Sequence, residues 1–142
     1  MDNIKILISC HKETAYIESD IMKPIQLGCA LTQKRLANML CDNEGENISE
    51  LNPLYCELTA QYWAWKNLDA DYYGFCHYRR YFNFSDNVYE EDEYGNVICS
   101  YLEKGAKEKY GLNDANMAEI ISKYDIITTT RKDLRQLAGG YH

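Results

Sequence analysis

The clearest periodic pattern of apolar and polar residues lies in residues 47–82, and it predicts a helix, a turn and a strand. Asn52 is a favourable N-cap, and Pro53 fits the first helical position because its missing N–H would be unpaired there in any case. Glu57 and Gln61 lie one turn apart, beside the predicted buried stripe of the helix. That stripe consists of apolar side chains at helical spacing: Leu54, Leu58, Tyr62, Trp65 and Leu68.

A turn at 68–71 follows the helix, and a run of aromatic and small apolar residues occupies 72–76. Such a run is typical of a strand that is buried on both faces. The strand leads directly into four cationic and aromatic side chains: His77, Tyr78, Arg79 and Arg80. In open α/β sheets, ligands bind outside the carboxyl ends of the strands. The sequence therefore predicts that this edge holds an anionic ligand.

The first part of the chain predicts two further strands. Residues 4–10 form an apolar run that ends at His11 and Lys12. Residues 24–31 form the second run, with Pro24 at its start, where proline is tolerated. Residues 41–52 are polar and acidic and predict a loop.

The second half of the chain continues the alternation of helices and strands. An acidic segment with a turn at 94–96 leads into a possible hairpin strand at 97–101, and a short helix is predicted at 104–110. Asn113 caps a clearer helix with a buried stripe of four residues, Met117, Ile120, Ile121 and Tyr124. A strand is predicted at 124–129, and the tail 131–142 has no periodic pattern.

This order of elements predicts an α/β fold with a Rossmann-like, mainly parallel sheet. The length of 142 residues suits one domain, residues 1–142. No helix follows the predicted strand 124–129 to cover it. The sequence therefore predicts that these residues are the amino-terminal portion of a longer domain.

Composition narrows the class of ligand. The net charge of −7 argues against a general nucleic-acid-binding protein, and the positive charge is local, at 77–80 and 131–135. The six cysteines form no C-x-x-C pair, and no apolar run approaches a signal peptide or a membrane span. The expected protein is cytoplasmic, with free thiols and a small anionic ligand.

Two predicted strands end alike, one in Cys10-His11-Lys12 and the other in Cys76-His77-Tyr78-Arg79. If the strands are parallel, both histidines reach the same edge of the sheet. The planar forks of Arg79 and Arg80 suit phosphate oxygens, although both residues could instead pair with the many surface acids. Neighbouring strand residues point to opposite faces, which argues against a metal site or a nucleophilic pair made of Cys and His.

Asp69-Ala70-Asp71 resembles the D-x-D metal motif of many sugar-nucleotide transferases. Paired carboxylates suit a hard divalent cation that also contacts phosphates. This triplet precedes its strand, however, and so belongs to the amino end of the sheet. We interpret it as a solvated turn, and no metal site is predicted in this segment. Neither a dinucleotide-binding glycine motif nor a P-loop is present.

The blocks NISELNPLYCELTAQYWAWKN and DYYGFCHYRRYF resemble a bacterial glycosyltransferase-like family long catalogued as a domain of unknown function. The segments ILISCHKE, PIQLGCAL and YDII also resemble it, in the same order, as does the closing DLRQLAGGYH. Members of the family occur with enzymes of capsule, exopolysaccharide and lipopolysaccharide synthesis. The resemblance implies a GT-A type fold, a nucleotide-sugar donor and a saccharide or lipid-linked saccharide acceptor. It implies action in the cytoplasm, with possible peripheral contact at the inner face of the membrane.

Site residues follow from the resemblance together with the edge argument. Arg79, Arg80 and His77 are expected to neutralise the diphosphate of the leaving group, and Glu57 is expected to orient a sugar hydroxyl. Residues expected to bind the donor are His11, Asn52, Tyr62, Trp63 and Tyr78, with Tyr62 or Trp63 stacking on a ring. Two alternatives stay open. One is a transferase whose divalent metal is held outside this segment, and the other is a non-catalytic domain that binds nucleotide or saccharide.

Overall fold

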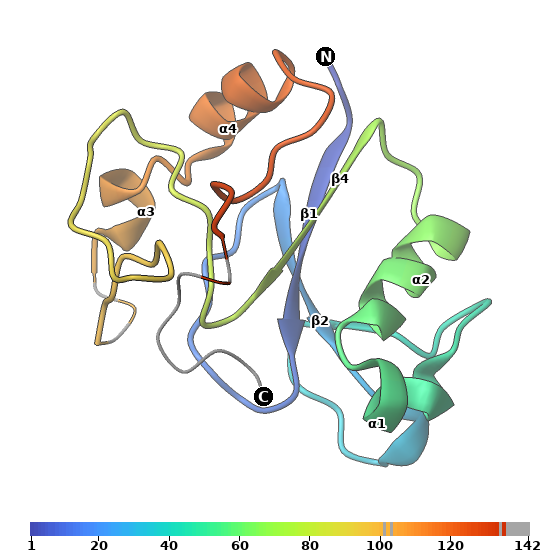
Figure 1. Cartoon of the computed structure of the whole chain (residues 1–142). Helices are drawn as coiled ribbons and strands as arrows, with labels where there is room; N and C mark the ends of the chain where they lie inside the picture. Colours follow the sequence, from blue (N-terminus) through green and yellow to red (C-terminus); the bar gives the residue numbers. More distant parts are fainter. Residues whose placement is uncertain (101, 103, 134, 136–142) are drawn as a thin grey trace.

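The computed structural model describes residues 1–100, 102, 104–133 and 135. Its centre is a four-stranded sheet in which every strand is parallel to its neighbours, in the order β3-β2-β1-β4. Figure 1 labels β2, β1 and β4. The strands are β1 (Ile4–Cys10), β2 (Met22–Gln26), β3 (Leu40–Cys41) and β4 (Tyr72–His77). The predicted α/β class with a parallel sheet is confirmed.

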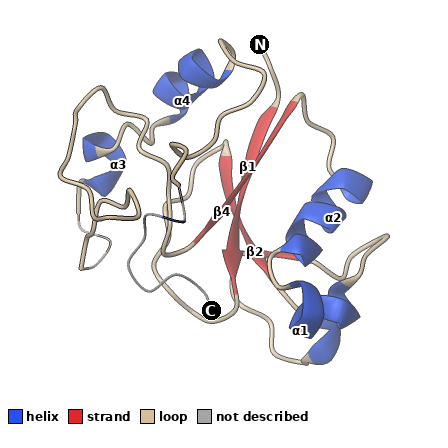
Figure 2. Cartoon of the chain, in the orientation of Figure 1, coloured by secondary structure: helices blue, strands red, loops and turns tan. Residues whose placement is uncertain are grey.

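Helices cover both faces of this sheet, as Figure 2 shows. On one side lie η1 (Cys29–Leu31), η2 (Ser49–Leu51), α1 (Asn52–Tyr55) and α2 (Leu58–Asn67), and on the other lie α3 (Ala106–Lys109) and α4 (Asp114–Ile121). The alternation of β1 explains the two layers, because successive strand residues point to opposite faces. One face of β1 packs into a core cluster with Met117 and Ile121 of α4, and Leu7 packs on the other face with Trp63 of α2.

The helix predicted from residue 53 is broken. Cys56 has φ 48° and ψ −127°, and this conformation separates α1 from α2. Asn52 is not an N-cap, because its backbone is already helical, and its side chain instead donates to the Cys56 carbonyl at 3.0 Å. A left-handed φ at a residue other than glycine cannot be read from hydrophobic spacing.

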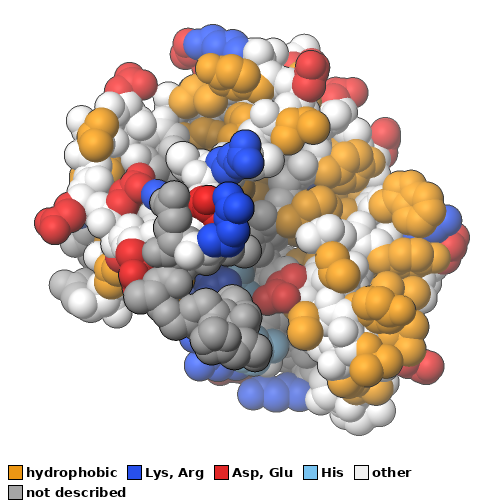
Figure 3. Space-filling view, in the orientation of Figure 1, with side chains coloured by type: hydrophobic (Ala, Val, Ile, Leu, Met, Phe, Trp, Pro, Cys, Tyr) orange, Lys and Arg blue, Asp and Glu red, His pale blue; other side chains and the backbone are white. Residues whose placement is uncertain are grey.

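The predicted apolar stripe of this helix is wrong as well. Leu54, Leu58 and Trp65 are 78%, 50% and 68% exposed, whereas the buried side chains of α2 are Thr59, Ala60, Trp63 and Ala64. Two alanines on the inner face let the helix approach Leu7 and Ile25 of the sheet closely. Figure 3 shows the resulting apolar surface along α1 and α2.

The second strand lies earlier than predicted, because β2 ends at Gln26 and residues 29–31 form η1. Pro24 stands inside β2, paired with Ile8, rather than at its start. β3 pairs only with Ile25 and Gln26, so β2 has a neighbour on one side only at Pro24. The missing N–H is tolerated at such an edge position.

β4 is an edge strand within the described residues, and its two faces are not fully buried as predicted; Tyr73 is 43% exposed. The strand predicted at 124–129 is absent, since these residues have no regular secondary structure. Residues 124–127 instead line a cavity of about 200 Å³ together with β4 and Phe84. Without strand partners, Ile126 is 79% exposed.

The remaining predictions concern the second half of the chain. The helix after Asn113 is confirmed, and the Asn113 side chain accepts from the Asn116 N–H at 2.9 Å. Tyr124 lies outside its buried stripe, at 56% exposure. The turn at 94–96 is present, but residues 97–100 form no strand, and residue 101 and most of the tail lie outside the described residues. Among the described helices, none is long and apolar enough to cross a membrane.

Candidate functional site

The parallel pairing of β1 with β4 brings the two predicted histidines to one edge of the sheet. Ser9 is the register partner of His77, so His11 follows β1 just beyond the point where His77 ends β4. The centroids of the two imidazole rings are 6.1 Å apart. The predicted arrangement, with parallel strands and both histidines on the same edge, is confirmed.

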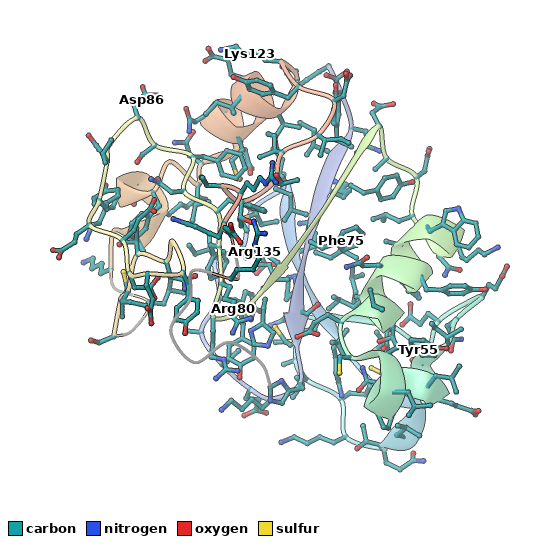
Figure 4. All side chains as sticks on the ribbon, in the orientation of Figure 1. Tyr55, Phe75, Arg80, Asp86, Lys123 and Arg135 are labelled. Carbon is teal, nitrogen blue, oxygen red and sulfur yellow. The ribbon has the colours of Figure 1, made fainter. Side chains whose placement is uncertain are left out.

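A tight turn directly after β4 presents Tyr78, Arg79 and Arg80. The His77 and Arg80 backbones exchange two hydrogen bonds, at 2.8 and 3.3 Å, and the Tyr78 N–H donates to the Ser9 carbonyl at 3.2 Å. The Arg79 N–H donates to Nδ1 of His77 at 3.2 Å. Figure 4 labels Arg80 at this end of the sheet. The turn therefore fixes three successive side chains at the carboxyl edge.

The charges around His77 make this edge cationic. Burial lowers the pKa of His77, and the nearby charges of Arg79, His11 and Arg80 lower it further, while Glu57 opposes them. Lowering the pKa favours the neutral imidazole, which matches a Nδ1 atom that accepts a hydrogen bond from Arg79. An anion bound here would stabilise the protonated ring.

Arg79 and Arg80 extend the cationic edge beyond the end of β4. Both residues are exposed, and neither forms a salt bridge with any residue that the structure describes. The alternative in which both arginines merely pair with surface acids is therefore not observed in this part of the chain. Lys and Arg side chains gather with histidine at the lower edge of the molecule in Figure 3.

Glu57 reaches the same edge through the break at Cys56. It directly precedes α2, is exposed, and is close enough to His77 to act on its pKa. This makes Glu57 a carboxylate beside a cationic cluster, with both oxygens able to accept hydrogen bonds from hydroxyl groups.

Three other predicted binding residues have their side chains engaged elsewhere. Asn52 donates to Cys56 and, at 3.2 Å, to the Thr59 hydroxyl. Trp63 is 6% exposed and donates from Nε1 to the Glu44 carbonyl at 2.8 Å, so it is a core residue rather than a stacking platform. The Tyr62 hydroxyl donates to Glu46 at 2.9 Å. The structure does not bring these side chains to His77.

The carboxylates of the D-x-D triplet lie at the opposite edge. The Asn3 N–H donates to Asp71 Oδ2 at 2.7 Å, and the Asn3 side chain donates to the Asp69 carbonyl at 2.7 Å. These bonds tie the turn to the start of β1, at the amino end of the sheet, as the sequence predicted. No group of three or more potential metal ligands is found among the described residues.

Sequence reasoning missed a buried carboxylate that holds this architecture together. Asp42 is 0% exposed and accepts hydrogen bonds from Gly28 N at 2.8 Å and Cys29 N at 3.0 Å. It also accepts from the hydroxyls of Ser49, at 2.6 Å, and Thr59, at 2.8 Å. One side chain thus joins η1 and η2, which precede the helix break at Cys56, to α2, which follows it. Glu57 lies between this break and α2. An acid in a polar loop gave no signal of burial.

Comparisons with known proteins agree with the observed fold. No curated protein matched the chain. Among solved structures, the chain is similar to the WbbM bifunctional glycosyltransferase in its apo form, with 39% identity and a TM-score of 0.79. The match covers 84% of this chain and 21% of that one, so the chain spans about a fifth of the length of this relative. A model of the domain of unknown function DUF4422 matches residues 5–141, and the chain therefore belongs to that family.

Proposed function

We propose that this chain forms the donor-binding part of a glycosyltransferase that uses a nucleotide sugar in bacterial surface-polysaccharide synthesis. The observation that carries the proposal is the convergence of His11, His77, Arg79 and Arg80 at the carboxyl edge of a parallel sheet. Ligands of open α/β sheets bind at such edges. The similarity to a bifunctional glycosyltransferase supports the same reading.

In this proposal the cationic groups act on the departing nucleoside diphosphate. Arg79 and Arg80 donate to phosphate oxygens, and their charge stabilises the negative charge that develops as the glycosidic bond to the nucleotide breaks. His77 takes up a proton as the anion binds. Glu57 accepts a hydrogen bond from a sugar hydroxyl. The acceptor is a saccharide or a lipid-linked saccharide, bound in the cytoplasm by parts of the site beyond these residues.

Isothermal titration with uridine diphosphate tests the proposal directly. Arg79→Ala with Arg80→Ala should weaken binding at least about a hundredfold, because two charge-assisted hydrogen bonds disappear. The matched control is Lys66→Ala with Lys123→Ala, which removes the same charge from exposed positions away from the carboxyl edge, since Lys66 lies in the last turn of α2 before the start of β4 and Lys123 follows α4. Binding that is absent in the native protein, or equal in both variants, would contradict the proposal.

A second candidate is a non-catalytic domain that binds nucleotide or saccharide. The observation that favours it is that the cationic edge by itself accounts for binding of an anion and requires no catalytic step. Mass spectrometry of the products measures transfer or hydrolysis of the sugar. Binding of the donor with neither reaction would select this candidate. Release of nucleoside diphosphate that depends on acceptor would select the transferase.

A further inference from the structure

The ring of Tyr78 lies at the centre of the charged edge. Its side chain is 7% exposed, whereas His11, Lys12 and Arg79 are exposed. The centroid of the Tyr78 ring is 4.2 Å from that of His77 and 5.5 Å from that of His11. It is 5.9 Å from Lys12 Nζ and 5.4 Å from Arg79 Cζ. Groups from the ends of two different strands therefore meet around one buried ring.

Backbone hydrogen bonding holds Tyr78 in place, whereas the charged ends of Lys12 and Arg79 are on long, flexible side chains. The Tyr78 N–H continues the β1–β4 pairing by donating to Ser9, inside the turn that His77 and Arg80 close. Lys12 and Arg79 have long side chains with many rotamers, and ordering each of them costs conformational entropy. A cation within about 6 Å of an aromatic centroid is attracted by the ring quadrupole. The ring therefore restricts where both cations can lie.

We infer that Tyr78 is a positioning residue, whose ring holds Lys12 and Arg79 where they receive the anionic part of a ligand. This inference rests on the proposed function for the identity of that ligand, a diphosphate. A ring that is 7% exposed offers little surface to a ligand, so the role differs from the direct contact expected from the sequence. Lys12 joins Arg79 as a phosphate-binding group.

A double-mutant cycle distinguishes positioning from a merely structural role. Titration with inorganic pyrophosphate should give Tyr78→Phe an affinity within about twofold of the native protein, because the ring remains. Tyr78→Leu should weaken binding about fivefold to thirtyfold, the loss expected from two cation–π contacts. In an Arg79→Ala background, Tyr78→Leu should weaken pyrophosphate binding by a clearly smaller factor, because one of the two cations that the ring positions has been removed. An equal loss in both backgrounds would overturn the inference.

The matched control is Phe84→Leu, which replaces another buried aromatic ring of the same core cluster away from the cations. It should bind pyrophosphate as the native protein does. If Phe84→Leu weakens binding as much as Tyr78→Leu, general loosening of the core explains the effect and the positioning role is overturned.

A measurement without ligand separates this inference from the proposed function. In the NMR spectrum of the free protein, the Tyr78 ring should shift the side-chain methylene protons of Lys12 and Arg79 away from random-coil values. The shifts should persist in Tyr78→Phe and disappear in Tyr78→Leu. If the native protein binds no pyrophosphate, the proposed function fails. The chemical shifts still show whether the Lys12 and Arg79 side chains lie over the Tyr78 ring. Random-coil values in the native protein would overturn the inference itself.

Discussion

Thr59 donates its hydroxyl hydrogen to the buried carboxylate of Asp42 at 2.8 Å, and this bond joins α2 to the end of β3. Both side chains are 0% exposed. Because Asp42 also accepts from two backbone N–H groups and from Ser49, its removal leaves these three donors without their acceptor in the interior, while the Thr59 hydroxyl keeps the Cys56 carbonyl at 3.1 Å as its acceptor. The Asp42 carboxylate thus holds the residues on both sides of Glu57 in place through its hydrogen bonds to Ser49 and Thr59.

Asp42→Ala should lower the free energy of unfolding by at least about 3 kcal/mol, since each buried donor left unpaired costs about 1–3 kcal/mol. Asp42→Asn should cost less, because one oxygen still accepts. Urea unfolding followed by circular dichroism measures both. Asp86→Ala, at an exposed position, is the control and should change stability by less than about 0.5 kcal/mol. Equal stability of Asp42→Ala and the control would contradict the role of Asp42.

The two tryptophans of α2 should respond in opposite ways to truncation. Trp63 is 6% exposed and packs on Leu7 and Ile25, so Trp63→Ala should cost about 3–5 kcal/mol of unfolding free energy. Trp65 is 68% exposed and contacts Lys66, whose Nζ lies 3.9 Å from the ring centroid, so Trp65→Ala should cost at most about 1 kcal/mol. Denaturant midpoints give both values. A larger loss for Trp65 would restore the helix face that the sequence predicted.

Local patterns predicted the carboxyl edge of the sheet better than they predicted the neighbouring helix. The runs that form β1 and β4 are short and apolar, and each leads into its histidine, so parallel pairing was enough to bring His11 and His77 together. The break at Cys56 depends on a backbone conformation that no spacing reveals. The buried face of α2 is made of small residues such as Ala60, because the helix packs closely on the sheet. A search for large apolar side chains at helical spacing therefore does not identify this face.

Two other features depend on partners distant in the sequence. Asp42 looks like an ordinary loop acid until Gly28 and Thr59 are placed around it. The β-branched run at 126–129 has strand propensity, but it does not pair with β4. A cavity lined by β4, Phe84 and Ile127 lies there instead. Propensity is a weak guide to a strand when pairing decides the outcome.

The charge environment of His77 predicts a defined pH dependence of stability. The pKa of His77 is lowered in the folded chain, by burial first and then by Arg79, so between that pKa and about 6.5 the unfolded chain binds more protons. Stability should therefore fall as the pH drops below about 6.5. His77→Gln should remove this part of the dependence. Denaturant midpoints measured between about pH 8 and pH 5 for both proteins provide the check, and identical profiles would contradict it.

Ligand binding should act on the same group in the opposite direction. A diphosphate beside His77 stabilises the imidazolium and raises its pKa, so binding takes up a proton. Titration of uridine diphosphate at pH 7 in two buffers of different ionisation enthalpy measures this uptake. The native protein should take up more protons than His77→Gln. The same uptake in both would place the phosphates away from His77.

The two acidic residues of the D-x-D triplet should be dispensable for donor binding. Asp71 accepts from Asn3 at the amino end of the sheet, and six residues of β4 at about 3.3 Å each place it more than about 15 Å from the turn after His77. One cation cannot bridge that distance to a phosphate held by Arg79. Asp69→Asn with Asp71→Asn should therefore leave binding of uridine diphosphate nearly unchanged, with or without a chelator, because the asparagine oxygen at position 71 still accepts from Asn3. Loss of binding in this variant, together with manganese-dependent binding in the native protein, would reverse the assignment and make these carboxylates the metal site.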